Sequence, residues 1–338
     1  MVTVRSAVAA VAALALVAAC GGDDDRTEAS GSGATIEVVA NFYPLAEAAV
    51  RVGGDQVEVT NLTPAGTEPH DLELTPDQVD DLEDADVVFY LGQGFQPAVA
   101  EIAGRRDAGA IDVLATLDLE AGASAALEAD EHEEENDGEA AGGGVEEAGV
   151  GEEEGEGDEH AESGLDPHFW LDPQRMIQAI DLIEAELAAV APDHAEAFAE
   201  NAARYTDELA ALDDRFEAAL ATCEHDEIVT SHAAFFYLAD RYGLAQTPIA
   251  GLSPEAEPDA ARIAELADRI EAEGITTVFY ESLVSPEVAE TLADEAGVRT
   301  AVLNPLEGLS EDQVEAGADY ASVMDENLSA LTEALGCN

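Results

Sequence analysis

Three histidines in separate parts of the chain have the residue type and the placement expected of metal ligands. His70 lies in a loop beyond a predicted strand, and His232 begins a predicted helix directly after another strand. His168 lies in a turn flanked by Pro167 and Pro173. Three neutral imidazoles with one oxygen ligand form a set that Zn²⁺ accepts tetrahedrally and without redox chemistry. The pattern predicts a zinc site if the fold brings these loops together.

Two further polar residues, Glu281 and Asn304, each follow the last residue of a predicted strand. Together with His232 they are expected at the carboxyl edge of one sheet, where open α/β sheets bind their ligands. His70 is expected at the equivalent edge of an earlier sheet. We therefore expect these side chains, together with His168, to converge on a cleft between two lobes.

Each of the three histidines also has a purely structural interpretation. His70 could cap the following helix, His168 could stabilise its turn, and His232 could be an ordinary first residue of a helix. His194 and His225 are expected at the surface. No H-E-x-x-H helix strengthens the metal hypothesis, so spacing alone leaves both interpretations open.

The strongest helix signal lies between the second and the third of these histidines. After Pro192, Asp193 and Glu196 form a capping pair, and apolar residues then recur with alternating steps of four and three. A helix over residues 193–220 would be roughly 40 Å long, which is more than a small domain needs. We predict one long rigid helix, residues 191–221, that links two lobes; the alternative is a long helix within a single domain.

Strand and helix patterns alternate on both sides of this helix, which is typical of α/β folds with parallel sheets. In the first lobe, residues 35–190, strands are expected at 36–40, 57–60, 87–91 and 111–114. In the second lobe, residues 222–338, strands are expected at 228–230, 247–250, 275–280 and 299–303. Helices are expected at 232–242 and 313–335, among others. The fold class is therefore α/β, with a parallel four-stranded sheet and flanking helices in each lobe.

The composition is extremely acidic. Against 76 acidic residues stand 12 basic ones, all arginine, and the formal net charge is −64. Such a field repels nucleic acid and attracts cations, so nucleic-acid partners are disfavoured. A high-salt habitat would explain most of this charge without any metal.

Residues 127–163 are almost entirely Glu, Asp, Gly and Ala, with His132 and His160, and we expect a disordered insertion there. Whether this insertion captures metal is left open.

The first nineteen residues have the pattern of a secretory signal peptide. Arg5 precedes an apolar run over residues 7–19 that is too short to span a bilayer. Residues 16–21 (LVAACG) match the lipobox of bacterial lipoproteins, which predicts lipidation of Cys20 and a flexible tether over residues 20–34. We expect an extracytoplasmic protein that is anchored to the membrane as a lipoprotein, at the cell surface or in the periplasm.

Export would place the two remaining cysteines, Cys223 and Cys337, in a compartment that permits disulfides. They are the only pair available once Cys20 is lipidated. We predict a disulfide between them; the alternative is two free buried thiols.

Five motifs, taken in order, resemble those of the zinc/manganese-specific solute-binding proteins of ABC transporters. They are residues 66–71 (GTEPHD) with 75–76, 166–173 (DPHFWLDP), 229–235 (VTSHAAF), 279–281 (FYE) and 303–306 (LNPL). The resemblance covers the chain from about residue 35 to its end. It implies a lipobox, an acidic insertion ahead of the second histidine, and a single rigid helix between the lobes.

In that family the first three motifs carry the metal ligands, so the resemblance implies that His70, His168 and His232 bind the metal. The manganese branch tends to place a carboxylate where His232 stands, and a third imidazole favours Zn²⁺ over the harder Mn²⁺. The last motif usually has an aspartate at the position of Asn304, so the fourth ligand is open. The candidates are water, Glu68, Glu281 and the Asn304 carbonyl.

The expected function is capture of zinc outside the membrane and its delivery to an ABC permease, by a monomer and without catalysis. A manganese- or iron-binding protein of the same transporter type is one alternative. An open fourth position near Glu68 or Glu281 could also polarise a water, as in a zinc hydrolase, although no substrate-pocket signature accompanies it. An adhesin or a surface metal store is a third class.

Overall fold

A computed structural model describes residues 35–92, 94–117, 119, 165–254 and 258–338. The predicted signal peptide, Cys20 with its tether, and the acidic insertion with His132 and His160 lie outside the described residues. Residues Thr35–Asn338 form one compact unit. Within the described ranges, no helix is both long and apolar enough to cross a membrane.

The first sheet contains four parallel strands in the order β2-β1-β3-β4. Its strands are β1 (Ile36–Ala40), β2 (Val57–Asn61), β3 (Val87–Tyr90) and β4 (Ala110–Asp112). The segments between them contain α1 (Tyr43–Gly53), η1 (Gly54–Gln56), η2 (Pro69–Asp71), α2 (Pro76–Asp84) and α3 (Pro97–Ala103). Residues 87–89 of the central strand β3 are all buried, because helices cover both faces of a parallel sheet.

The fourth strand ends earlier than predicted. The Asp112 side chain accepts a hydrogen bond from the Ala115 N–H and so begins the short helix α4 (Val113–Thr116). A side-chain cap of this kind stabilises the first turn of a helix. Val113 and Leu114, which were predicted to extend the strand, are therefore helical.

The second sheet repeats the first, with four parallel strands in the order β6-β5-β7-β8. Its strands are β5 (Glu227–Thr230), β6 (Ala245–Pro248), β7 (Thr277–Tyr280) and β8 (Arg299–Val302). The helices between them are α8 (Phe236–Tyr242), α9 (Ala260–Glu273) and α10 (Glu287–Ala296). The predicted pair of parallel four-stranded sheets is confirmed, with β6 two residues earlier than expected.

Two helix predictions in the second lobe are wrong, one in its start and the other in its continuity. The helix expected from His232 begins only at Phe236, because the His232 carbonyl accepts hydrogen bonds from Thr230 Oγ1 (2.8 Å) and Gln246 Nε2 (3.0 Å). The terminal helix is divided into α11 (Glu311–Ala316) and α12 (Tyr320–Leu335). Gly317 ends α11 in the left-handed region (φ 73°), and an Asp319–Ser322 capping box begins α12.

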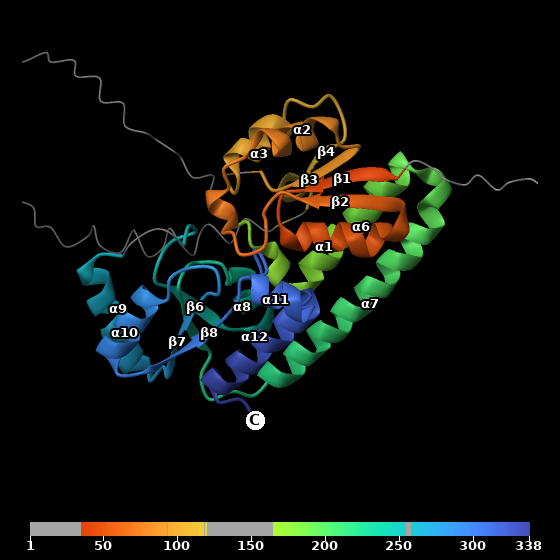
Figure 1. Cartoon of the computed structure of the whole chain (residues 1–338). Helices are drawn as coiled ribbons and strands as arrows, with labels where there is room; N and C mark the ends of the chain where they lie inside the picture. Colours follow the sequence, from red (N-terminus) through yellow and green to blue (C-terminus); the bar gives the residue numbers. More distant parts are fainter. Residues whose placement is uncertain (1–34, 93, 118, 120–164, 255–257) are drawn as a thin grey trace, which may run out of the picture. The chain divides into compact units, whose positions relative to one another are not determined.

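The predicted long helix is present. The turn η5 (Pro192–His194) leads into α7 (Ala195–Leu220), whose buried stripe includes Phe198, Tyr205, Leu212 and Phe216. No side chain caps its start, so the predicted Asp193–Glu196 capping pair is wrong. Figure 1 shows α7 running from α1 and α6 (Pro173–Val190) to α12, and it contacts all three.

One apolar core connects the two halves of the fold. It includes side chains of β1 and β3, of α6 and α7, and of β5 and α12. Because α7 contributes its buried stripe along most of its length to this core, bending the helix would expose apolar surface. The packing therefore supports our expectation that α7 behaves as a stiff connection between the lobes.

A disulfide joins Cys223, just after α7, to Cys337, just after α12, across a sequence separation of 114 residues. We expect no reactive thiol in a denatured, unreduced chain in which Cys20 is replaced by alanine. Reduction should lower the free energy of unfolding by up to about 4–5 kcal/mol in the chain-entropy account. Thiol titration and denaturant unfolding with and without reductant check this, and two reactive thiols before reduction would contradict it.

Candidate metal centre

Four side chains with metal-ligand atoms form one buried cluster. His70, His168, His232 and Glu307 each offer one atom, and these atoms all lie within 4.8 Å of one another. The side chains of His168, His232 and Glu307 are 0% exposed and that of His70 is 12% exposed. The three predicted histidines are thus brought together, and the carboxylate of Glu307, which was not predicted, joins them.

Four of the distances within the cluster are close to those of a tetrahedral zinc site. Glu307 Oε1 lies 3.0 Å from His168 Nε2, 3.3 Å from His232 Nε2 and 3.4 Å from His70 Nε2. The Nε2 atoms of His168 and His232 are 3.4 Å apart. In a tetrahedral site with bonds of 2.0–2.1 Å, neighbouring ligand atoms are separated by roughly 3.3–3.4 Å. His168, His232 and Glu307 therefore already have the spacing of zinc ligands, and His70 lies within 4.8 Å of them.

Loops at strand ends position the ligand candidates from both sheets. His70 lies in η2 beyond the end of β2, and the Glu68 carboxylate accepts a hydrogen bond from the His70 N–H. His232 follows β5 and Glu307 follows β8, so both come from the carboxyl edge of the second sheet. His168 directly precedes η4 (Phe169–Leu171), at the start of the segment that leads into α6.

Carboxylates hold two of the imidazoles in the orientation that metal binding needs. His168 Nδ1 lies 2.7 Å from Asp166 Oδ1, and His232 Nδ1 lies 2.6 Å from Glu281 Oε1. All four residues are buried. When the Nδ1–H group of an imidazole donates a hydrogen bond to a carboxylate, the lone pair of Nε2 is free to bind a metal. Glu281, a predicted candidate for the fourth ligand, therefore orients His232 and lies outside the group of four.

Asn304 and Glu68, the other protein candidates for the fourth ligand, have different roles. The Asn304 carbonyl accepts from Asn327 Nδ2 (2.7 Å), and its side chain accepts from the Leu306 N–H (2.8 Å). Glu68 caps η2 and remains outside the group of four. Burial, and then the charge of Glu307, raise the pKa of Glu68 to about 8.

A strained turn places Glu307 in the cluster. Leu306, directly before it, has a positive φ of 57°, which is uncommon for a residue with a side chain. Besides the Asn304 contacts, the Trp170 indole N–H donates to the Pro305 carbonyl at 2.7 Å, and this indole is fully buried. The one sequence signal for Glu307 was its place three residues after Asn304 at the same sheet edge.

The charges within the cluster shift the pKa values of its members in opposite directions. Burial alone lowers the pKa of His232, but the charges of Glu281 and Glu307 outweigh it and raise this pKa well above its usual value. Burial also lowers the pKa of His168, and the Asp166 carboxylate, followed by Glu307, brings it above its usual value. For Glu307, burial raises the pKa, but the imidazoles outweigh it and hold this pKa well below the usual range.

We expect the zinc affinity to fall as the pH decreases, starting above the ordinary histidine pKa of about 6.5. His168 and His232 keep their protons in the metal-free chain up to their raised pKa values, so zinc must displace these protons. Below those values, each protonated ligand should lower the affinity by about tenfold per pH unit. Chelator competition between about pH 5.5 and 8.5 measures this.

The metal-free chain should show a different pH profile. The raised histidine pKa values stabilise the fold below about pH 6.5, and this contribution is lost as the pH rises through them. The lowered pKa of Glu307 contributes above about pH 4.5 and is lost as the pH falls through it. The thermal stabilisation by zinc should therefore grow with pH. A stabilisation by zinc that is equal on both sides of neutrality would contradict this assignment of charges.

The remaining histidines of the described residues lie elsewhere. His194 is half-buried at the start of α7, with its ring 6.2 Å from that of Phe198, and His225 is half-buried in the loop before β5. Neither belongs to the group of four. The prediction that both lie outside the site agrees with the structure, although neither is fully exposed.

Two α/β lobes with a buried cluster of three imidazoles and one carboxylate between them define a metal-binding protein of the solute-binding class. Residues 38–334 match the family model described as zinc-uptake complex component A, periplasmic. The chain belongs to this family.

Two relatives and one solved structure support this placement. The chain is 37% identical over 299 residues to the zinc-binding lipoprotein AdcA of Streptococcus pneumoniae (serotype 4, strain ATCC BAA-334 / TIGR4), a match that covers 88% of this chain and 55% of AdcA. It is 35% identical over 323 residues to the high-affinity zinc uptake system protein ZnuA of Bacillus subtilis (strain 168), covering 95% and 94%. The chain thus spans about half the length of AdcA and nearly all of that ZnuA.

The crystal structure of the Zn(II)-bound ZnuA-like domain of Streptococcus pneumoniae AdcA superposes on this fold with a TM-score of 0.69. The two are 34% identical, and the match covers 89% of this chain and 99% of that domain. The resemblance inferred from the five motifs is therefore confirmed at the level of family and fold.

Proposed function

We propose that this protein binds Zn²⁺ outside the cytoplasmic membrane and delivers it to an ABC permease. The observation that carries the proposal is the buried group of His70, His168, His232 and Glu307, in which Glu307 Oε1 lies 3.0–3.4 Å from Nε2 of each histidine. Relatives named as zinc-binding and zinc-uptake proteins, and a zinc-bound structural neighbour, support the same metal. Zinc is the cargo of this site, so reversible binding is the activity.

The donor set favours zinc over manganese. Imidazole nitrogen suits zinc, whereas Mn²⁺ prefers carboxylate, carbonyl and water oxygens in six-coordinate geometry. Three nitrogens and one oxygen therefore favour Zn²⁺. A manganese- or iron-binding protein of the same transporter type remains the alternative that a competition experiment must exclude.

The fourth protein donor also favours transport over hydrolysis. Catalytic zinc sites keep one position open for a water, whereas closed sites use four protein ligands. Glu307 supplies the oxygen that a catalytic water would otherwise provide, and it is fully buried. The zinc-hydrolase alternative would need Glu307 to leave the metal.

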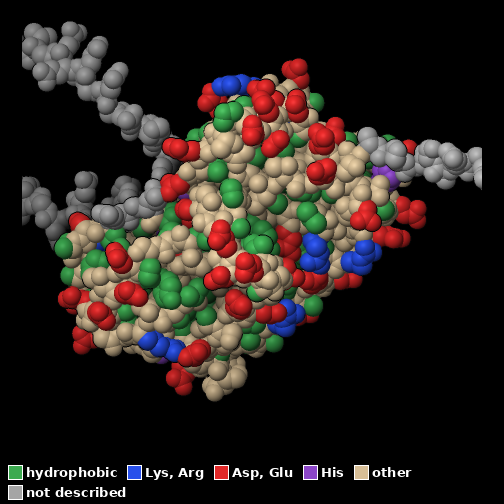
Figure 2. Space-filling view, viewed as in Figure 1, with side chains coloured by type: hydrophobic (Ala, Val, Ile, Leu, Met, Phe, Trp, Pro, Cys, Tyr) green, Lys and Arg blue, Asp and Glu red, His purple; other side chains and the backbone are tan. Residues whose placement is uncertain are grey.

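The proposed location rests on residues outside the described ranges, and the surface charge is consistent with the proposed cargo. Lipidation of Cys20 would anchor the protein to the membrane, with residues 20–34 as a tether, and residues 35–338 would act as a monomer. Figure 2 shows acidic side chains spread over the visible face with few arginines between them. Such a surface attracts cations and repels nucleic acid, which is consistent with capture of a divalent metal.

The test is a metal titration of the purified chain that begins at Cys20. We expect Zn²⁺ to outcompete Mn²⁺ by several orders of magnitude in a competition against a chromophoric chelator. Equal affinities would overturn the choice of metal. Metal-dependent ester or peptide hydrolysis that His70→Ala abolishes would overturn the transport proposal in favour of an enzyme.

A further inference from the structure

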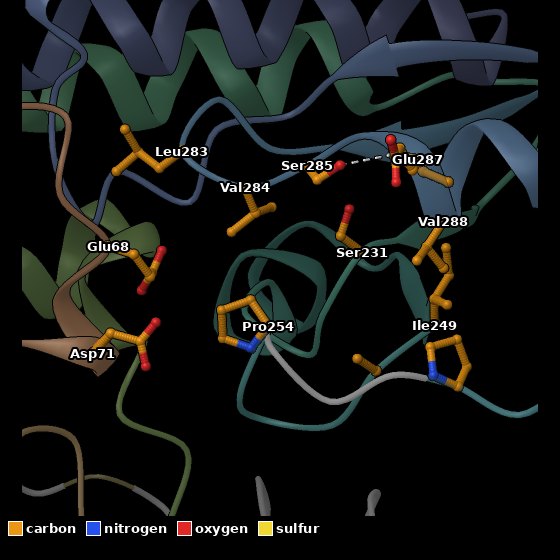
Figure 3. Close-up of a pocket in the computed structure, with 13 residues that line it drawn as sticks. Glu68, Asp71, Ser231, Ile249, Pro254, Leu283, Val284, Ser285, Glu287 and Val288 are labelled. Carbon is orange, nitrogen blue, oxygen red and sulfur yellow. Dashed lines mark hydrogen bonds between the residues drawn. The ribbon is translucent and has the colours of Figure 1, made fainter.

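A pocket of about 370 Å³ lies beside the metal centre, and residues that adjoin the ligand candidates in sequence line it. Glu68 and Asp71 flank His70, Ser231 directly precedes His232, and Leu283 follows Glu281. Figure 3 shows Glu68 and Asp71 at one side of this pocket, and Ile249 and Val288 at the opposite side with Val284 between them.

The metal centre needs such an opening because its ligands are almost completely enclosed. Only His70 among the four has measurable side-chain exposure, at 12%. An ion must therefore arrive past the loop that carries His70. Glu68 and Asp71 of this loop line the pocket, so the pocket ends at the loop that carries His70.

Leu283 lines the pocket and lies close to Gly308, the residue directly after Glu307. A Cβ atom added to Gly308, directly after Glu307, would lie 3.3 Å from Leu283 Cδ1 and 3.6 Å from the Thr67 carbonyl oxygen. The Gly66 N–H also donates to the Leu309 carbonyl at 2.8 Å. The His70 loop, the Glu307 loop and the loop after β7 thus meet around Gly308, and Leu283 of the last of these loops also lines the pocket.

The size and chemistry of the pocket suit a hydrated cation. Six waters occupy roughly 180 Å³ at about 30 Å³ each, which is less than the pocket volume. Two acidic side chains, Glu68 and Asp71, line the pocket, and a cation that passes them favours their ionised form.

We propose that this pocket is the route by which hydrated Zn²⁺ enters and leaves the site, and that Leu283 limits the rate of passage. The inference rests on the proposed function and adds a kinetic path to it. A side chain that lies on the route but does not touch the bound metal changes the free-energy barrier for zinc entry and for zinc exit by the same amount. Obstruction should therefore slow binding and release together and leave the dissociation constant nearly unchanged.

Two substitutions test the route in opposite directions. Val284→Phe adds an aromatic ring inside the pocket and should slow both zinc association and zinc release by about tenfold, within the range over which variants of one binding site differ in association rate. Leu283→Ala removes the side chain beside Gly308 and should accelerate both rates. Val314→Phe is the matched control, because Val314 is 51% exposed on α11 and lies outside the pocket.

The only tryptophan of the chain serves as the reporter. The Trp170 ring centroid lies 5.1 Å from that of His168, so zinc binding should change its fluorescence. Stopped-flow mixing of the full mature chain with Zn²⁺ gives the association rate, and excess EDTA gives the release rate. Melting curves of the metal-free variants confirm that they are folded.

The outcomes separate the two proposals. If the unaltered chain binds zinc but both pocket variants keep its rates, the route is wrong and the proposed function stands. If Val284→Phe weakens the affinity without slowing association, the pocket contributes to the site and is not the route. If the unaltered chain does not bind zinc, the proposed function itself fails.

Discussion

Replacing His168 with alanine should raise the dissociation constant for zinc by at least about a thousandfold, since losing only an outer hydrogen-bond partner of a ligand costs about 10- to 100-fold. The substitution deletes one of four ligand candidates and leaves a space that is closed to solvent, because the His168 side chain is 0% exposed. Competition of the purified variant against a chromophoric zinc chelator measures the effect.

His194→Ala is the matched control for this experiment. It removes an imidazole from the start of α7, outside the group of four, and should leave zinc affinity unchanged. Asp166→Asn should give an intermediate loss of about 10- to 100-fold, because it weakens only the orientation of His168. Equal losses from His168→Ala and His194→Ala would remove His168 from the ligand set.

Glu307→Gln should have the second largest effect and lower zinc affinity by more than about 100-fold, which exceeds the loss expected for an orienting carboxylate. The amide keeps the size of the side chain but removes the negative charge that faces three imidazoles at 3.0–3.4 Å. The same change at Glu281 should cost less, because Glu281 contacts His232 through Nδ1. Zinc titration by calorimetry compares the two variants.

Two further variants complete this comparison. Glu290→Gln makes the same change of charge at an exposed position of α10 outside the pocket, and its affinity should match that of the unaltered chain. Glu68→Gln should cost less than about tenfold, because its carboxylate lies outside the cluster. A larger loss at Glu68 than at Glu307 would show that Glu68 is the fourth ligand.

Local patterns were sufficient for most of the fold. Parallel strands buried on both faces are short apolar runs between turn residues, so β1, β3 and β7 were predicted within a few residues. The apolar stripe of α7 also depends only on helical periodicity. Errors arose where side-chain caps, a left-handed glycine or hydrogen bonds from other segments determined the element boundary. Gln246, for example, contacts the His232 carbonyl and accompanies the delayed start of α8.

The sequence by itself determined the three histidines, because each follows a strand end or lies in a Pro-flanked turn, and the resemblance to a known family assigned their role. Only the tertiary structure identified Glu307. Its position depends on a positive φ at Leu306 and on buried hydrogen bonds that Asn327 and Trp170 make to residues 304 and 305. A ligand candidate placed by contacts between distant segments leaves no local periodic signal, so no pattern within its own loop could distinguish it from Asn304.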